Sequence, residues 1–284
     1  MIVAPESMTP QEIGDYYDQL DLAYRLLWGC HLHHGYWTRQ TRSVDAAVTR
    51  LIDLTSDWLR IRKTDRLLDI GCGYGATGRY LNHRFSCHVT GITVSRHQFD
   101  LGRDSREAGG VQLRFGDYLN WIFPKPSFDG VLALESFSHF ANKKWFFQKV
   151  STELKPGARL VMTDLVVTPT GADRCRKWLL QPLCQTARIP SLAMATELHR
   201  WAQRAGLKTI ITEDLTPHVR RTWSHLFLRS LRHIPSGFFK ARESLPVGSR
   251  ELAVGLNAIR LWLAYRMGAV EYRLHVYEKN DPPL

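Results

Sequence analysis

The alternation of apolar and polar positions predicts two amphipathic helices at the start of the chain. In residues 10–28, apolar or aromatic side chains recur every three or four positions, at Ile13, Tyr17, Leu20 and Tyr24. Residues 43–61 repeat this spacing at Val44, Val48, Leu51 and Leu59. Ser43 comes just before these positions and is a suitable N-cap. We therefore expect residues 1–65 to form an N-terminal helical cap.

From residue 66 the pattern changes to short apolar segments separated by helical ones. The apolar segments are typical of strands and lie at 66–70, 88–93, 111–117, 128–136 and 158–167. Helices are expected between them, one ending near Phe85 and others at 95–108 and 142–155. This alternation predicts βαβ units, a parallel sheet and right-handed crossovers. Residues 66–168 are the expected α/β core.

Beyond residue 168 the alternation becomes irregular. A segment with prolines leads to an expected helix at 194–205 and a strand at 207–213. Residues 217–268 are predicted to be helical, and residues 269–279 alternate as a last strand. We expect 169–284 to complete the sheet and to place a helical lid over one end of a single compact domain.

The composition of the 284 residues is that of a folded protein. Hydrophobic residues make up 44% and aromatic residues 11% of the chain, which excludes a disordered class. No apolar run reaches the roughly 18 residues of a membrane span, and the N-terminus lacks a signal-peptide pattern. The five cysteines are odd in number and widely spread, which favours reduced thiols. We expect a soluble, cytoplasmic protein.

The charge is strongly basic, because 38 Lys and Arg residues oppose 27 acids and give a formal net charge of +11. Such a surface serves nucleic acids, anionic membranes or acidic substrates, and it also occurs on proteins with none of these partners. Charge alone does not choose among them.

A glycine-rich turn follows the first predicted strand. The segment LLDIGCGYGATG sets glycines between that strand and a helix, at Gly71, Gly73, Gly75 and Gly78. Glycines allow close approach to a ligand, and the helix N-terminus favours an anion, so we expect a nucleotide-type ligand. The last three glycines also fit the dinucleotide pattern G-x-G-x-x-G, with Arg96 available for the 2′-phosphate of NADP. An NADP-dependent oxidoreductase is therefore an open alternative.

Further motifs favour another class. Asp69 stands two residues before the first glycine, GDY (116–118) closes the third strand, and LKPGARLVMTD leads into the fifth. With these features the sequence resembles the class I S-adenosylmethionine-dependent methyltransferases. The resemblance implies a Rossmann-like α/β fold with a seven-stranded, mostly parallel sheet and a helical cap or lid.

The resemblance extends to one small-molecule group within that class. YYDQLDLAYRLLWGCHLHHGYW (16–37), GITVSRHQ (91–98), ALESFSHF (133–140), DLTPHVRRTW (214–223) and the ending MGAVEYRLHVYEK are similar to the γ-tocopherol methyltransferase-like group. That group is related to sterol C-methyltransferases and cyclopropane fatty acid synthases. The similarity spans about residues 10–279. Phe137, Ser138, Phe140 and the Arg-rich stretch 220–242 depart from the pattern, at positions where we expect substrate contacts.

The resemblance implies a set of S-adenosylmethionine-binding residues. The glycine loop would lie under the methionine part of the cofactor, Thr93 and Gln98 would bind the ribose, and Asp117 and Tyr118 would border the adenine. Aromatic side chains of the cap would cover the sulfonium. The complete set is Tyr16, His34, Tyr36, Asp69, Gly71, Cys72, Gly73, Gly75, Thr93, Val94, Gln98, Asp117, Tyr118 and Glu135.

Three residues are the catalytic candidates. His139 is the candidate general base, because imidazole titrates near neutral pH. Glu135 is expected to orient cofactor or substrate, and Tyr17 to close the pocket. A structural role for His139 is the alternative. The cluster CHLHH (30–34) cannot easily bring four ligands around one ion, so we expect no metal.

The resulting hypothesis is methyl transfer to a small, mostly apolar acceptor such as an isoprenoid, a phenol or another natural product. Carbon is slightly favoured over oxygen or nitrogen, because aromatic side chains and a carboxylate can shelter a cationic intermediate. An anionic isoprenoid diphosphate and a catalytically silent binding protein are the alternatives. The basic segment 217–242 fits peripheral membrane contact, substrate recognition or a merely charged lid. No nucleic-acid partner is expected, and the oligomeric state is left open.

Overall fold

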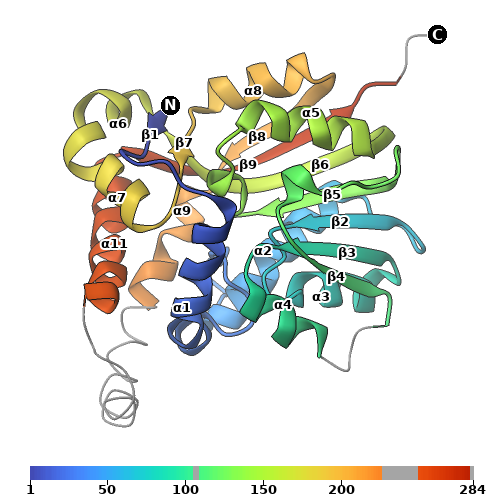
Figure 1. Cartoon of the computed structure of the whole chain (residues 1–284), viewed down its shortest axis with the longest axis horizontal. Helices are drawn as coiled ribbons and strands as arrows, with labels where there is room; N and C mark the ends of the chain where they lie inside the picture. The colour runs from blue at the N-terminus through green and yellow to red at the C-terminus, as the bar shows by residue number, and fades with distance from the viewer. Residues whose placement is uncertain (105–108, 226–248, 282–284) are drawn as a thin grey trace.

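Seven strands pair into one sheet in the computed structural model, which describes residues 1–104, 109–225 and 249–281. Their order across the sheet is β4-β3-β2-β5-β6-β9-β8 (Figure 1). Only β9 runs antiparallel to its neighbours. The prediction of a seven-stranded, mostly parallel sheet is confirmed. The strands are β2 (Arg66–Ile70), β3 (His88–Thr93), β4 (Val111–Phe115), β5 (Phe128–Leu134), β6 (Leu154–Val167), β8 (Leu207–Asp214) and β9 (Val270–Lys279).

Helices cover both faces of the sheet, as the apolar composition of its strands requires. On one face α5 (Lys143–Glu153) and α8 (Ala195–Arg204) pack against a core that includes Phe146, Phe147 and Leu198. On the other, α2 (Val44–Leu59) and α3 (Ala76–Phe85) contribute residues such as Leu51, Ile52 and Leu81. Helix α4 (Arg96–Arg103) lies along β4.

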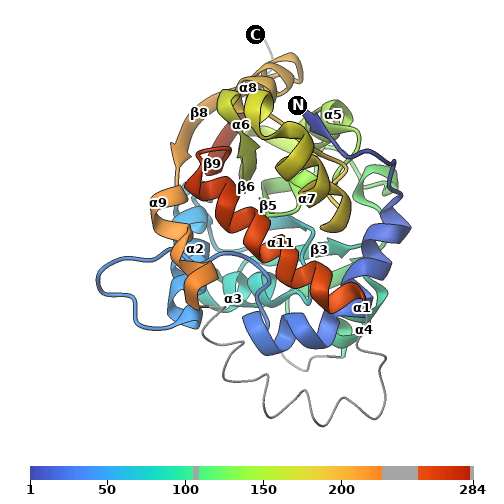
Figure 2. The ribbon, with the colours of Figure 1, turned by 90° about the vertical axis from the view of Figure 1, so that its left-hand side faces the viewer.

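A third group of elements gathers beside the sheet rather than on its faces (Figure 2). It comprises α1, α6, a π-helical segment, α7 and α11, with the short pair β1–β7 and helix α9 nearby. None of the helices in the described ranges is long and apolar enough to cross a membrane. The bounds are β1 (Ile2–Val3), α1 (Pro10–Trp28), α6 (Pro169–Arg174), the π-helical segment (Arg176–Leu180), α7 (Gln181–Thr186), β7 (Ser191–Leu192), α9 (Thr216–Val219) and α11 (Ser249–Arg266).

The structure corrects several expectations about elements. Helices α6 and α7 occupy a segment for which the sequence predicts no helix. Pro169 and Pro182 lie in the first turns of these helices, where proline is tolerated. Of the two N-terminal helices only α1 lies beside the sheet, since α2 belongs to a face layer. Most of the predicted basic helix, 226–242, is outside the described residues, as is the end of the helix predicted at 95–108.

Helix α1 is fixed to the loop between β3 and α4. Gly14 lies so close to this loop that a Cβ there would be 2.2 Å from the Val94 carbonyl oxygen. The Asp18 carboxylate accepts hydrogen bonds from the Ser95 hydroxyl and, at 3.2 Å, from the His97 N–H. Asp21, further along the helix, accepts from the Tyr74 hydroxyl. These contacts hold α1 over the loops that follow β2 and β3.

We predict that Gly14→Ala destabilises the protein and moves α1. Overpacking costs roughly 1–3 kcal/mol, and overlap with a main-chain atom places this case near the upper end. Alanine regains only about 1 kcal/mol of helix propensity. Urea unfolding should therefore show a net loss, whereas Gly109→Ala, whose Cβ would meet nothing within 4 Å, should not. Equal stability of the two variants would contradict the tight contact.

Candidate active site

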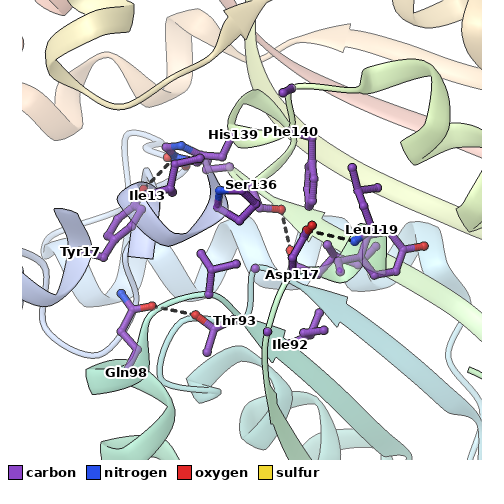
Figure 3. Close-up of a pocket in the computed structure, with 18 of the residues that line it drawn as sticks. Ile13, Tyr17, Ile92, Thr93, Gln98, Asp117, Leu119, Ser136, His139 and Phe140 are labelled. Atoms are coloured by element: carbon purple, nitrogen blue, oxygen red, sulfur yellow. Dashed lines mark hydrogen bonds between the residues drawn. The ribbon is translucent and has the colours of Figure 1, made fainter. Parts of the chain in front are cut away.

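A cavity opens where the chain reverses its direction across the sheet. Strands β2 and β5 are neighbours, but β3 and β4 continue to one side and β6 to the other, which makes their carboxyl ends a binding crevice. Side chains from α1 close it (Figure 3). The lining residues are Met8, Pro10, Ile13, Tyr17, Leu32, Ile70, Gly71, Ile92, Thr93, Val94, Gln98, Gly116, Asp117, Tyr118, Leu119, Leu134, Glu135, Ser136, His139, Phe140 and Ala141.

The glycine loop after β2 lies at this crevice and leads into the N-terminus of α3. The N–H groups of Gly71 and Cys72 are used, because both donate to the Ile92 carbonyl, at 2.9 and 3.1 Å. Gly75 is the N-cap of α3 and offers no side chain to its first turn. Gly73 has a φ of +56°, and a Cβ there would meet only Gln98 Oε1, at 4.0 Å. The loop thus has room for a ligand and a helix N-terminus suited to an anion.

Polar side chains from the next two strands line the opposite wall. The Thr93 hydroxyl donates to Gln98 Oε1 at 3.1 Å, and both residues are buried (Figure 3). The Asp117 carboxylate accepts from the Leu119 N–H at 3.1 Å and from Asn120 Nδ2 at 2.9 Å. Burial raises the pKa of Asp117, although the Leu119 bond opposes this. These groups can receive hydroxyl and amino groups of a ligand.

Several buried polar atoms of the described residues have no hydrogen-bond partner. Among them are Oδ2 of Asp69, just before the glycine loop, and Nε2 of His33, whose Nδ1 donates to the His34 carbonyl. Burial raises the pKa of Asp69 to about 7. Such groups are costly unless a ligand or water satisfies them. A cationic or donor-bearing ligand at the glycine loop would relieve this cost.

Glu135 stands at the end of β5 with its carboxylate fully engaged. Oε1 accepts from the His34 N–H at 2.5 Å and the Tyr272 hydroxyl at 2.8 Å, and Oε2 accepts from His34 Nδ1 at 2.8 Å. Burial alone would raise the pKa of Glu135, but the imidazole and hydrogen bonds of His34 outweigh it and lower the pKa. Glu135 is therefore an anion in the cavity wall.

His139 and Tyr17 form a hydrogen-bonded pair on the same wall (Figure 3). Nδ1 of His139 must donate to the Arg188 carbonyl, 2.8 Å away, because a carbonyl only accepts. Nε2 is then the acceptor for the Tyr17 hydroxyl at 2.9 Å. Burial lowers the pKa of His139 to about 4, despite the bond to Arg188, and burial raises the pKa of Tyr17. Both are neutral at physiological pH.

Lys143 supports this pair, a role that the sequence did not suggest. Its ammonium donates to the carbonyls of Phe137 and Ser138, both at 3.1 Å, and of Phe140 at 2.9 Å. These carbonyls belong to the turn that carries His139, so the turn is held from behind. The sequence analysis also gave no site role to the apolar residues that line the cavity from α1 and from the segment before it, because Ile13 and Met8 fit equally well into a hydrophobic core.

Nine of the proposed site residues line the cavity, and seven do not. Asp69, Cys72, Gly73 and Gly75 belong to the loop beneath it. Tyr36 stacks on His218 with 4.3 Å between ring centres, and His34 lies behind Glu135, where its Nε2 accepts from Trp223. Neither residue lines the cavity, and their role in covering a cofactor stays a prediction. The hydroxyl of Tyr118 points into the core and donates to Glu153, so this residue lines the cavity without offering a polar group.

Comparison with known proteins identifies the family. The model of the mycolic acid cyclopropane synthetase family matches residues 7–236. The chain is 31% identical over 248 residues to 27-O-demethylrifamycin SV methyltransferase of Amycolatopsis mediterranei, covering 82% of this chain and 89% of that protein. It is also 31% identical over 224 residues to the O-methyltransferase cnsE of Penicillium expansum, covering 76% of this chain and 79% of that one.

Solved structures share the fold. The cyclopropane synthase MmaA2 from Mycobacterium tuberculosis superposes with a TM-score of 0.81 at 18% identity, over 97% of this chain and all of that one. Geranyl diphosphate C-methyltransferase from Streptomyces coelicolor superposes with a TM-score of 0.73 at 21% identity, over 97% of this chain and all of that one.

The cavity fits the cofactor of this family. The unpartnered Asp69 carboxylate suits an ammonium group, and the N-terminus of α3 suits a carboxylate, the two charges of a methionine moiety. Thr93 and Gln98 would hold a ribose, and Asp117 would accept from an adenine amino group. The chain thus belongs to the mycolic acid cyclopropane synthetase family of class I S-adenosylmethionine-dependent methyltransferases.

Proposed function

We propose that this methyltransferase acts on a hydroxyl oxygen of a small, mostly apolar natural product. The observation that carries the proposal is the Tyr17–His139 pair in the cavity wall. A hydroxyl acceptor must lose its proton when it is methylated, and a paired phenol and imidazole can receive it. When bound, S-adenosylmethionine supplies a methyl group on a sulfonium that loses its positive charge as the methyl leaves.

The pair can move a proton although His139 is a weak base. The acceptor hydroxyl would donate to the Tyr17 oxygen while the Tyr17 proton points to His139 Nε2. A hydroxyl oxygen that gains a methyl group becomes strongly acidic, so an imidazole with a pKa of about 4 is basic enough to take its proton. Arg188 and Lys143 fix the geometry beforehand, which favours alignment over reorganisation.

Aromatic side chains beside the pair support an apolar acceptor. Successive ring contacts run from Tyr17 through Tyr24, Trp28 and Trp223 to His34, with ring centres 5.4–5.6 Å apart. His34 donates to Glu135, which is four residues before His139 in the chain. The rings therefore connect Tyr17 with the strand end that carries its partner His139. These rings pack on one another behind the pair, while the apolar acceptor is supported by the cavity lining, which includes Ile13, Leu32 and Phe140.

Oxygen is preferred here to the carbon acceptor favoured by the sequence. The relatives named above include two enzymes whose names specify oxygen. Carbon methylation is the second candidate, because the anionic Glu135 beside aromatic rings is suited to stabilise a cation. A diphosphate substrate was the alternative suggested by the Arg-rich stretch 220–242. Most of that stretch lies outside the described residues.

We predict that Gly73→Arg weakens S-adenosylmethionine binding at least 100-fold. The new side chain would occupy the open space beside Gln98 that the cofactor needs. Isothermal titration calorimetry measures the loss directly.

The matched control is Gly157→Arg. Gly157 has a φ of +71° and open surroundings, so this variant carries similar backbone strain and the same side chain away from the cavity. It should bind the cofactor as the wild type does. Micromolar affinity of Gly73→Arg would contradict the site.

We predict that Tyr17→Phe lowers kcat about 100-fold with a hydroxyl acceptor, because general-base assistance contributes 10²–10⁴-fold. Cofactor affinity should change little, since the ring remains. Tyr36→Phe is the control, because Tyr36 stacks on His218 and should tolerate loss of its hydroxyl. An unchanged kcat for Tyr17→Phe would exclude the proton relay and favour a carbon acceptor.

The pH dependence follows from the lowered pKa of His139, which is neutral above about pH 4. Between pH 6 and 8, kcat should show no inflection from this residue, and it should fall only when His139 becomes protonated near pH 4. An inflection of kcat near pH 6.5 that disappears in His139→Gln would show that burial does not lower the pKa of His139.

A further inference from the structure

The turn that carries His139 is too short to hold itself in place. It is a single 3₁₀ turn, Phe137–His139, preceded by Ser136 and followed by Phe140. Two hydrogen bonds close it, from the N–H groups of His139 and Phe140 to the carbonyls of Ser136 and Phe137, both at 3.1 Å. Ser136, His139 and Phe140 line the cavity (Figure 3). The position of the His139 imidazole therefore depends on what the turn contacts elsewhere.

Asp164 of β6 holds this turn by a main-chain N–H. Its Oδ2 accepts from the Ser138 N–H at 2.7 Å, and its Oδ1 accepts from the Leu165 N–H, also at 2.7 Å. Asp164 is 2% exposed, so water does not compete for either bond. Ser136, the N-cap of the turn, gives it no side-chain hydrogen bond. A carboxylate from a neighbouring strand thus does what a capping side chain does in a longer helix.

Lys143 of α5 holds the same turn by its carbonyls. Its ammonium donates to the Ser138 carbonyl as well as to those of Phe137 and Phe140. Ser138, the residue directly before His139, is therefore bound by a carboxylate at its N–H and by an ammonium at its carbonyl. The negative charge is at the N–H side and the positive charge at the carbonyl side, as the dipoles of the peptide groups favour.

Both charges are in the interior of the protein. Burial raises the pKa of Asp164, although the bonds from Ser138 and Leu165 and the charge of Lys143 oppose this. Burial lowers the pKa of Lys143, and the charge of Asp164 opposes that shift. Buried charges cost free energy unless hydrogen bonds satisfy them, and charge-assisted hydrogen bonds are about twice as strong as neutral ones. The turn is therefore held far more firmly than its own two hydrogen bonds allow.

We propose that Asp164 and Lys143 are positioning residues that fix the direction of His139 Nε2 by binding both sides of Ser138. The effect on the rate rests on the proposed oxygen methylation, in which the acceptor proton passes to Tyr17 and the Tyr17 proton passes to Nε2. If the turn shifts, Nε2 loses the Tyr17 hydroxyl. A displacement of about 1 Å at a reacting group can lower a rate roughly 100-fold.

The test replaces Asp164 by asparagine and observes His139 directly. An amide has one acceptor oxygen, so in Asp164→Asn its NH₂ group faces one of the two N–H donors and that bond is lost. The imidazole is observed by ¹⁵N NMR of histidine-labelled protein saturated with S-adenosylhomocysteine, and His139→Gln identifies its signals. The wild type should show one tautomer, protonated at Nδ1, with a pKa of about 4. In Asp164→Asn the two nitrogen signals should approach each other, and the pKa of His139 should rise toward about 6.5.

The direction of this change separates positioning from a charge effect. Removal of a nearby carboxylate by itself lowers the pKa of an imidazole, so a rise reports that the ring has left its buried hydrogen bonds. Burial is the largest cause of the lowered pKa of His139. Of the charged groups that face His139, Lys143 lowers its pKa further and Glu135 raises it, and both are still present in Asp164→Asn.

Activity and stability give two further readouts. With the hydroxyl acceptor assayed for Tyr17→Phe, kcat of Asp164→Asn should fall about 10-fold. The dissociation constant of S-adenosylmethionine, measured by calorimetry, should change less than about twofold. The double variant Asp164→Asn/Lys143→Met has neither buried charge. Its Tm should exceed that of Lys143→Met, in which the carboxylate is left without its counter-charge, but its kcat should stay low. If Asp164→Asn does not fold, the double variant replaces it in the NMR measurement.

Lys149→Met is the matched control for Lys143→Met. Lys149 lies on the same helix, is 5% exposed, and donates to Glu153 and to the Trp121 carbonyl instead of to the His139 turn. The control therefore also loses a buried lysine and should also lower the Tm. Its His139 signals, and its kcat at saturating cofactor, should be those of the wild type.

The proposal is overturned if Asp164→Asn keeps the tautomer and the pKa of the wild-type His139, or if the wild type already contains both tautomers. It is also overturned if Lys149→Met changes the tautomer signals as much as Lys143→Met does. A displaced imidazole with an unchanged kcat would support the positioning role and contradict the proton relay, so the failure of this inference and that of the proposed function are distinguishable.

Discussion

The bidentate contact between His34 and Glu135 joins the two halves of the active site. Glu135 ends a central strand, and His34 belongs to the segment between α1 and α2, so the contact links residues 101 positions apart. Tyr272 from β9 completes the set of donors, and Trp223 donates to the far nitrogen of His34. A buried carboxylate needs such partners, because a buried charge without hydrogen bonds costs free energy. The cap and the sheet therefore take one relative position.

Backbone geometry at the end of β5 continues this constraint toward the reacting groups. Glu135 has a φ of +53°, a left-handed conformation that non-glycine residues adopt at a cost of about 1–3 kcal/mol. Its N–H donates to the Thr163 carbonyl, and the turn that follows is held by Lys143. Arg188, also left-handed, uses its carbonyl to orient His139. The backbone strain and the buried carboxylate of Glu135 thus lie at the end of β5, where the reacting groups must be held rigidly. Hydrogen bonds from other segments of the chain compensate for their cost.

The sequence predicted what local chemistry determines and missed what distant contacts determine. Apolar runs and alternating positions predicted all seven strands of the main sheet, and the glycine loop was recognised from its own residues. The positions of His34 and Tyr36 depend on Glu135 and His218, which are far away in the chain, and no periodicity encodes such pairs. The prolines at positions 169 and 182 led to the wrong prediction of a segment without helices. Proline breaks a helix interior, but it is favoured in the first turn of a helix. Lys143 was missed because a lysine at the start of a helix is usually on the surface, whereas here it binds three carbonyls.

The cofactor side and the acceptor side of the cavity differ in how freely their residues can be substituted. The cofactor side consists of strand ends and backbone donors, so substitutions there would disturb the sheet. The cavity is closed by side chains of α1, which packs beside the sheet and can vary without altering it. Relatives and structural neighbours whose names specify oxygen, carbon and cyclopropane chemistry fit this division. In this chain Tyr17 of α1 faces His139, whose Nδ1 is held by the Arg188 carbonyl. The direction in which this pair meets the acceptor in the cavity, rather than the strength of the base, would then select the oxygen that receives the methyl group.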